Sequence, residues 1–238
     1  QEVYQNYQEL ANKGKVAQEK WEAMFVEYVE KYPELGKLWD RYFDPKVAQG
    51  LIDAEGFWPD TQKAEATRSL SGKQIQFIKD QLPNLIGGSA DLAPSNKTYM
   101  NGVGDFSKEN YAGRNLHFGV RELAMTAISN GILLHGGLKA FAATFFVFSD
   151  YTKPMARLSA LMGLPLVFVF THDSIGVGED GPTHEPIEQL AMFRSMPNFH
   201  VFRPADAAEP AAAWESALKS THTPTALVLS RQNLPQLA

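Results

Sequence analysis

The chain contains no cysteine, and this absence excludes two kinds of site. Without thiols it can form neither a disulfide framework nor a thiolate metal centre. It also lacks any apolar run of the roughly 18–20 residues that a bilayer-spanning helix needs. The longest apolar stretch, 164–170, has the length of a strand. The sequence therefore predicts no membrane partner, and a reducing cytoplasm suits its composition.

Positive charge is also scarce. The chain has 22 Lys and Arg against 27 Asp and Glu, which gives a net charge of −5. Proteins that bind nucleic acid usually carry a surplus of Lys and Arg to neutralise phosphates, so no nucleic-acid partner is expected. With 238 residues, of which 44% are hydrophobic, the chain is long enough for one sizeable core with a helical extension.

The beginning of the chain has helical periodicity. Its large apolar residues recur at helical spacing between charged ones: Trp21, Phe25, Tyr28, Val29 and Tyr32. This pattern predicts a helix over 16–32. A second helix is predicted from 34 to about 48. We interpret residues 1–65 as a helical linker that precedes a domain at 66–238.

In that domain, predicted strands and helices alternate. The strands are expected at 85–88, 116–118, 138–143, 166–170, 199–202 and 225–229. The helices are expected at 67–81, 121–134, 145–162, 187–194 and 207–219. Strict alternation predicts an α/β fold with a doubly wound, mainly parallel, six-stranded sheet covered by helices on both faces. Ligands bind such sheets at the carboxyl ends of the strands, where the polar residues of this sequence gather.

The most informative polar segment, 172–184, follows a predicted buried strand. It contains three glycines, a proline, two histidines and three carboxylates. Glycines let a backbone approach a ligand closely, while His172, His184 and Asp180 can hydrogen-bond hydroxyl groups or move protons. An ordinary surface loop is the alternative. A metal site is disfavoured by the wide separation of the histidines and the lack of an HExxH pattern.

Glu122 and an aromatic stripe are further candidates, each with a structural alternative. Glu122 opens a predicted helix directly after a strand, but the helix dipole favours any carboxylate at that position. Phe145, Phe148 and Tyr151 share one face of a predicted helix. Such a stripe usually packs in the core, although one that starts at the end of a strand can also stack against a flat ligand.

Three arginines are candidate anion ligands: Arg68, Arg157 and Arg231. Arg231 directly follows the last predicted strand. For each arginine, a solvated or ion-paired side chain is the alternative. The segment 87–91 contains two adjacent glycines but has neither the GxGxxG nor the GK[ST] spacing, so no nucleotide phosphate loop is predicted there.

Five segments, taken in order, resemble the motifs of the transketolase family: 87–96, 118–122, 145–151, 172–186 and 230–233. The resemblance begins near Arg68, and the residues before it resemble the linker that precedes this domain in the family. It implies the central, pyrimidine-binding domain of an enzyme that uses thiamine diphosphate to move a two-carbon ketol unit from a ketose phosphate to an aldose phosphate. In the family an N-terminal domain holds the diphosphate with Mg or Ca. Its Gly-Asp-Gly motif is absent here, so we expect a fragment that is inactive alone.

The resemblance also assigns roles to residues. It implies that Glu122 hydrogen-bonds the ring nitrogen of the aminopyrimidine and so activates the cofactor. Phe145, Phe148 and Tyr151 would form the pocket for that ring, with Phe148 stacked on it. No residue of this chain is expected to bind the metal.

A second set of residues resembles the sugar-phosphate site of the family: Arg68, Ser95, His172, Asp180, His184 and Arg231. Arginine suits phosphate because its planar fork binds two oxygens and stays charged. In the family's arrangement Asp180 would contact a substrate hydroxyl. His184 would bind the carbonyl oxygen or the C1 hydroxyl and assist proton transfer.

The family also implies a cytoplasmic homodimer of the pentose phosphate pathway, with the cofactor shared between subunits. The helix after Arg121 carries small residues that favour close packing, so we expect residues 118–151 to form much of a dimer interface. Leu123 and Glu185 depart from the usual motifs without touching an assigned role. Dihydroxyacetone synthase, deoxyxylulose phosphate synthase and a non-catalytic dimerisation module remain alternatives.

Overall fold

The computed structural model describes residues 1–44, 46–48, 50–60 and 63–237. Residues 45, 49, 61 and 62 of the predicted linker, and residue 238 of the predicted domain, lie outside this part. Tertiary contacts divide the chain into two compact units, Gln1–Asp44 and Pro45–Ala238. No helix among the described residues combines the length and the apolar character needed to cross a membrane.

The first unit consists of two helices, α1 (Glu2–Lys31) and α2 (Pro33–Phe43). Helix α1 begins at Glu2 rather than at Val16, because the early Glu, Gln, Ala and Lys residues favour helix without an apolar period. Helix α2 ends at Phe43 rather than at residue 48. Asp44 is extended, as expected for a residue that precedes a proline.

Aromatic side chains join the two helices. Phe25 of α1 lies with its ring centroid 5.0 Å from that of Trp39 of α2 and stacks on Trp21 at 5.1 Å. Gly36 of α2 permits this approach, since a Cβ there would come within 2.7 Å of the Val29 side chain. The large apolar residues at helical spacing in 21–32 therefore supply the contact between α1 and α2.

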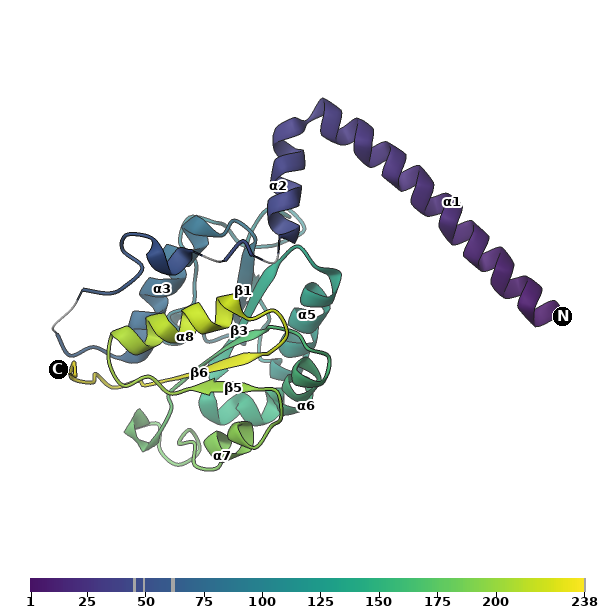
Figure 1. Cartoon of the computed structure of the whole chain (residues 1–238). Helices are drawn as coiled ribbons and strands as arrows, with labels where there is room; N and C mark the ends of the chain where they lie inside the picture. The colour runs from purple at the N-terminus through teal and green to yellow at the C-terminus, as the bar shows by residue number, and fades with distance from the viewer. Residues whose placement is uncertain (45, 49, 61–62, 238) are drawn as a thin grey trace. The chain divides into compact units, whose positions relative to one another are not determined.

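The second unit contains a six-stranded sheet (Figure 1). Its strands are β1 (Leu85–Ser89), β2 (Asn115–His117), β3 (Lys139–Phe145), β4 (Val167–Thr171), β5 (His200–Phe202) and β6 (Thr225–Leu229). The strand order is β2-β1-β3-β4-β6-β5, and every neighbouring pair is parallel. The predicted fold class is confirmed.

Helices cover both faces of this sheet (Figure 1). They are α3 (Thr67–Gln81), α4 (Ala93–Asn96), α5 (Glu122–His135), α6 (Ser149–Leu161), α7 (Gln189–Arg194) and α8 (Ala208–Lys219), with short 3₁₀ turns at Leu51–Asp53, Phe146–Phe148 and Ile175–Val177. Helices α3 and α8 pack on one face, and α5, α6 and α7 on the other. The bounds of α3 and β6 coincide with the prediction, whereas the short α4 was not predicted.

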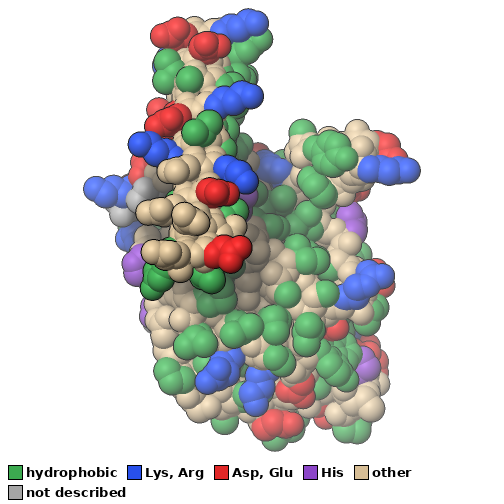
Figure 2. All heavy atoms as spheres, turned by 90° about the vertical axis from the view of Figure 1, so that its right-hand side faces the viewer, with side chains coloured by type: hydrophobic (Ala, Val, Ile, Leu, Met, Phe, Trp, Pro, Cys, Tyr) green, Lys and Arg blue, Asp and Glu red, His purple; other side chains and the backbone are tan. Residues whose placement is uncertain are grey.

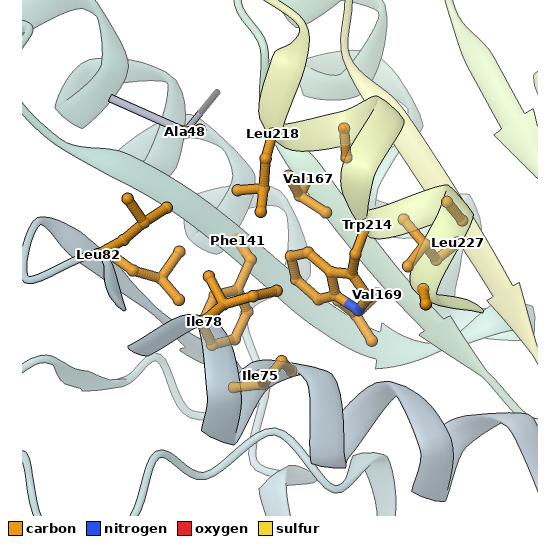
Figure 3. Packing of buried hydrophobic residues seen from close by; sticks show 14 of the residues in the cluster. Ala48, Ile75, Ile78, Leu82, Phe141, Val167, Val169, Trp214, Leu218 and Leu227 are labelled. Atoms are coloured by element: carbon orange, nitrogen blue, oxygen red, sulfur yellow. The ribbon is translucent and has the colours of Figure 1, made fainter. Parts of the chain in front are cut away.

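The two faces of β4 show why its sequence is apolar throughout. Val167 and Val169 point into the core beneath α3 and α8, while Phe168 and Phe170 point into the opposite core. A parallel strand buried on both faces needs this continuous apolar run. In the first core, Trp214 of α8 meets the ring of Phe141 edge-on at 6.4 Å, among aliphatic side chains of α3 (Figure 3). Its indole N–H donates to Ser71 Oγ at 2.9 Å.

The predicted start of a helix at Phe145 is wrong. Strand β3 extends to Phe145, because Thr144 and Phe145 still pair with Phe170 and Thr171 of β4. A 3₁₀ turn at Phe146–Phe148 follows, and α6 begins only at Ser149. Aromatic residues spaced by three thus mark a strand, a turn and a helix in succession.

The topology places a crevice between β1 and β3. The chain leaves β1 towards β2 on one side and leaves β3 towards β4 on the other, although β1 and β3 are neighbours. Where the direction of winding reverses in this way, the loops diverge and open a space at the carboxyl ends of the strands. The ends of β1 and β3 are Ser89 and Phe145.

Candidate active site

A cavity of about 510 Å³ occupies this crevice. It is lined by Ala90, Asp91, Leu92, Val120, Glu122, Phe148 and Tyr151. These residues come from the segments that follow β1, β2 and β3. The cavity therefore combines two carboxylate side chains, of Asp91 and Glu122, with the aromatic rings of Phe148 and Tyr151.

Glu122 is the first residue of α5 and is only 8% exposed. Gly119, with φ of +66°, turns the chain between β2 and α5, and this left-handed conformation favours glycine. Arg121 then closes the turn, donating from its guanidinium to the carbonyl of Phe118 at 2.9 Å. Among the described residues, no hydrogen bond or ion pair reaches the carboxylate of Glu122, so its oxygens are available to a ligand.

The three predicted aromatic residues divide between two places. Phe148 is half-buried and lies almost parallel to Phe145, with centroids 6.1 Å apart and planes 8° apart. Tyr151 is exposed and follows Phe148 at 6.3 Å, and both line the cavity. Phe145 is buried instead against His172, with ring centroids 3.7 Å apart.

A second group of predicted residues meets around His172. Arg68, at the start of α3, points one guanidinium nitrogen at His172 Nε2 at 3.4 Å. The same nitrogen donates to the backbone carbonyl of Ser95 at 2.8 Å. His184 lies edge-on to Phe148 with ring centroids 5.4 Å apart, which places it between the aromatic cavity and this group. Ser95 thus acts on Arg68 through its carbonyl oxygen.

Like charges surround His172 and Arg68. Burial, followed by the positive charges of Arg68, Arg231 and His184, lowers the pKa of His172 to about 3. Burial and the charge of Arg231 also lower the pKa of Arg68. Two arginines that repel each other across a buried histidine form a place where an anion would be stabilised.

Two other predicted residues lie at the margin of this group. Arg231 forms an ion pair with Glu179, from its guanidinium to the carboxylate at 3.0 Å. Asp180, next in the loop, is exposed, and no described bond connects it to His172 or Arg231. The structure therefore brings Arg68, His172, His184 and Arg231 together but leaves Asp180 facing solvent.

Sequence reasoning missed two residues that are linked to His172 by hydrogen bonds, Thr171 directly and Asn96 through Thr171. Thr171 accepts or donates a hydrogen bond at His172 Nδ1 at 2.8 Å, and Asn96 accepts one from Thr171 at 2.7 Å. Both side chains are buried. A signal was present in the sequence, since Thr171 is the one hydroxyl residue that ends an otherwise apolar strand.

A neighbouring cavity of about 520 Å³ was not predicted. Asp91 lines both cavities, and the second one is further lined by residues of β1 and β2, among them Gly88, Asn115 and His117. His117 Nε2 lies 2.9 Å from a carboxylate oxygen of Asp105. Among the described residues, no group of His, Cys, Asp and Glu could hold a metal ion.

Comparison with known proteins identifies the family. Residues 63–236 match the family model described as the pyrimidine binding domain of transketolase. Residues 1–48 match the model described as the thiamine diphosphate binding domain of transketolase. The chain belongs to the transketolase family.

Curated transketolases are similar along the whole chain. The transketolase of Halalkalibacterium halodurans is 53% identical over 237 residues, which cover 100% of this chain and 35% of that protein. The transketolase of Bacillus subtilis is 50% identical over 237 residues, which cover 99% of this chain and 35% of that protein. The chain thus spans about a third of the length of these relatives.

Solved transketolase structures share the fold. A Pichia stipitis transketolase in complex with sedoheptulose-7-phosphate has a TM-score of 0.88 and 47% identity, covering 94% of this chain and 34% of that one. Transketolase from Leishmania mexicana has a TM-score of 0.90 and 41% identity, covering 95% and 34%. A structure described as a split gene transketolase, inactive β4 tetramer, has a TM-score of 0.58 and 28% identity, covering 74% and 55%.

These findings confirm the predicted transketolase family and its thiamine diphosphate-binding fold. The domain boundary at residue 65 stays a prediction. The pyrimidine-domain match begins at 63, whereas the compact units divide after Asp44. The roles of the individual site residues also stay predictions, and they are developed below from their geometry.

Proposed function

We propose that this chain is the central part of a working transketolase and supplies the aminopyrimidine half of its active site. The enzyme would transfer a two-carbon ketol unit between sugar phosphates in the cytoplasmic pentose phosphate pathway. The observation that carries the proposal is the buried Glu122 carboxylate, which has no protein partner among the described residues and faces a cavity lined by aromatic rings.

The residues of the cavity fit an aminopyrimidine. Its volume of about 510 Å³ admits a flat ring, Phe148 and Tyr151 offer aromatic surface, and Glu122 offers an unshared carboxylate. These three residues would hold the ring. When bound, thiamine diphosphate supplies the electron sink for breaking a carbon–carbon bond beside a carbonyl group.

Glu122 would hold a proton on the ring nitrogen that it faces. A carboxylate accepts a strong, short hydrogen bond from a protonated nitrogen, and the low dielectric of a buried site strengthens that bond. Helix α5 fixes the backbone of Glu122, so the carboxylate needs little reorganisation when the ring arrives. Phe148 would cover a face of the aminopyrimidine ring and keep water away from it.

Arg68 and Arg231 would bind the phosphate of the sugar. Burial and then the nearby charge of Arg231 lower the pKa of Arg68, and a phosphate between the two arginines would relieve their repulsion. His184, whose Nδ1 lies 2.8 Å from Thr183 Oγ1, stands between the aromatic cavity and these arginines, where it would contact the reacting end of the sugar. Asp180 would contact a sugar hydroxyl from its exposed position in the same loop as His184.

The rest of the active site would come from the remainder of the full-length enzyme. We assign the diphosphate and a Mg or Ca ion to residues outside this chain, since the chain spans only 35% of its relatives. The structural neighbour described as an inactive β4 tetramer of a split gene transketolase supports this division.

An arginine substitution tests the sugar-phosphate site. In the full-length enzyme, Arg231→Ala is expected to raise the KM for phosphorylated substrates roughly tenfold or more, since a charged hydrogen bond to phosphate is lost. The kcat should fall less. Steady-state kinetics against donor concentration measures both constants.

Arg194→Ala is the matched control. Arg194 is exposed at the end of α7, which packs on the face of the sheet opposite the helix that carries Arg68. It should leave the KM unchanged. An unchanged KM in Arg231→Ala as well would remove Arg231 from the proposed phosphate site.

We also propose that the enzyme is a homodimer formed through α5 and α6. These helices and the turn before α5 expose large apolar side chains: Val120, Leu123, Ile128, Leu134, Tyr151 and Leu161. Figure 2 shows hydrophobic side chains spread over the side of the molecule that carries α5 and α6. A two-fold interface pairs such a patch with its own copy, and a stable one buries at least roughly 1,200 Å².

A charge within this patch tests the dimer. Leu123 is 48% exposed on the first turn of α5, and Leu123→Arg is expected to weaken association at least about a hundredfold, because an unpaired charge would be buried. Sedimentation equilibrium across a range of concentrations measures the change. Leu237→Arg, at a residue 62% exposed elsewhere, is the control and should leave association unchanged. Equal dimerisation of both variants would place the interface elsewhere.

A further inference from the structure

A line of buried polar side chains leads from β1 to His172. Ser89 Oγ lies 2.6 Å from Thr98 Oγ1, and the amide nitrogen of Asn96 donates to Ser89 Oγ at 3.1 Å. Thr171 Oγ1 donates to the amide oxygen of Asn96 at 2.7 Å. All four side chains are no more than 3% exposed. None of the roles assigned above uses this line.

The donors and acceptors along this line fix the position of one proton. Thr171 has a single hydroxyl hydrogen, and the amide oxygen of Asn96 can only accept, so that hydrogen goes to Asn96. The oxygen of Thr171 is then left to accept from His172 Nδ1, 2.8 Å away. A neutral imidazole protonated on Nδ1 carries a lone pair on Nε2.

Arg68 completes the line on the other side of the ring. A guanidinium can only donate, so the nitrogen of Arg68 that lies 3.4 Å from His172 Nε2 requires an acceptor there. The same nitrogen donates to Ser95 O, which leaves the rest of the guanidinium for other partners. The hydrogen bonds at both ring nitrogens of His172 therefore require the same tautomer, the neutral ring protonated on Nδ1.

The backbone holds the ring in this place. His172 has φ of +61°, a left-handed conformation that few residues other than glycine adopt. Strain of this kind persists only where the surroundings determine it, and it often marks functional sites. Here the bond to Thr171 and the stacking of the ring on Phe145 hold the conformation.

We propose that Asn96 and Thr171 are positioning residues that keep the proton of His172 on Nδ1, so that Nε2 accepts from Arg68 and holds its guanidinium beside Arg231 for an anionic ligand. The tautomer and the position of Arg68 follow from this structure alone. The identity of the ligand as a sugar phosphate rests on the function proposed above.

In this arrangement His172 is a neutral acceptor and contributes no charge to the site. The groups that face it are Arg68 of α3, Arg231 after β6 and His184 of the loop, while Phe145 of β3 is uncharged. Burial and these positive charges hold the pKa of His172 far below its usual range, at about 3. The ring then stays neutral from pH 5 to 8, and only the arginines attract the anion.

Nitrogen NMR of the histidine-labelled chain tests the tautomer. Each ring nitrogen reports whether it carries a proton, and His172→Asn assigns the signal among the six histidines. We expect His172 to show a protonated Nδ1 and an unprotonated Nε2 throughout pH 5 to 8. A protonated Nε2, or an imidazolium at pH 6, would overturn the proposed relay, the hydrogen bonds from Asn96 through Thr171 to His172, whether or not the chain binds phosphate.

Three threonine variants separate positioning from general packing. Thr171→Val keeps the shape but removes the hydroxyl, so the proton is expected to move to Nε2, while Thr171→Ser should restore it to Nδ1. Thr225→Val is the control, since Thr225 is equally buried on β6 and the structure describes no partner for its hydroxyl. If Thr171→Val retains the tautomer of the unsubstituted chain, the relay is wrong. If that variant does not fold, the spectrum of the unsubstituted chain still decides.

Titration with inorganic phosphate then tests the consequence for Arg68. Losing one guanidinium hydrogen bond to an anion costs about tenfold in affinity, so Thr171→Val should bind phosphate roughly tenfold more weakly and Thr171→Ser nearly normally. Equal affinity in all variants would overturn the role in positioning Arg68. A chain with the expected tautomer that binds no phosphate would support the relay and count against the proposed sugar-phosphate site.

Discussion

Replacing Glu122 with glutamine is expected to lower the turnover of the full-length enzyme by roughly 10²–10⁴-fold, the range for a group that assists proton transfer. Glutamine keeps the shape of the side chain and its place at the start of α5. Its amide oxygen can still accept a hydrogen bond but carries no negative charge, so the ring nitrogen would lose the charged partner that favours its protonated form. Stopped-flow or steady-state measurement of ketol transfer gives the turnover.

Cofactor affinity should fall much less than turnover in this variant, because the aromatic contacts of Phe148 and Tyr151 remain. Glu215→Gln serves as the control. Glu215 also lies on a helix, but its partner is Lys219 on the surface of α8. Near-normal turnover in Glu122→Gln would reduce Glu122 to a carboxylate that stabilises the first turn of its helix.

The sheet could be predicted because its strands are buried on both faces. Continuous apolar runs such as 166–170 and 226–229 occur in few other settings, and the helices between them have a clear apolar period. Parallel topology follows from the alternation alone. What the pattern could not give was the end of β3, because Thr144 and Phe145 are held in the strand by pairing with β4.

The sequence points to each site residue separately, and the structure adds how these residues are grouped. Phe145 looked like a member of the aromatic stripe, but its position at the end of a strand turns it towards His172 and away from Phe148's cavity. The spacing of the aromatic residues predicts one continuous helix, so it could not show that Phe145 contacts His172. The contact depends on β3 and β4 lying side by side.

The buried hydroxyl and amide groups were beyond sequence reasoning for a different reason. Thr171 and Asn96 are 75 positions apart in the sequence and meet only through the tertiary fold. A threonine that ends a strand and an asparagine that ends a short helix have many ordinary roles. Only the chain of distances from Ser89 to Arg68 shows that they act on one histidine.

The 238-residue chain alone is expected to catalyse no ketol transfer, even with thiamine diphosphate and Mg²⁺ supplied. Glu122, Phe148 and Tyr151 can meet only the aminopyrimidine ring. Among the described residues, no group of carboxylates and histidines could hold the metal that would neutralise the diphosphate. Without that anchor, the reactive part of the cofactor has no fixed orientation, and most of the catalytic advantage of a held geometry is lost.

A coupled assay with purified chain at catalytic concentration measures this, using a ketose phosphate donor and an aldose phosphate acceptor. The full-length enzyme is the positive control. The same chain carrying Glu122→Gln is the matched negative control. If both preparations show the same activity, that activity belongs to a contaminant. Turnover by the unsubstituted chain that Glu122→Gln abolishes would contradict the prediction. It would mean that this chain holds the whole cofactor, and that the division of the site proposed here is wrong.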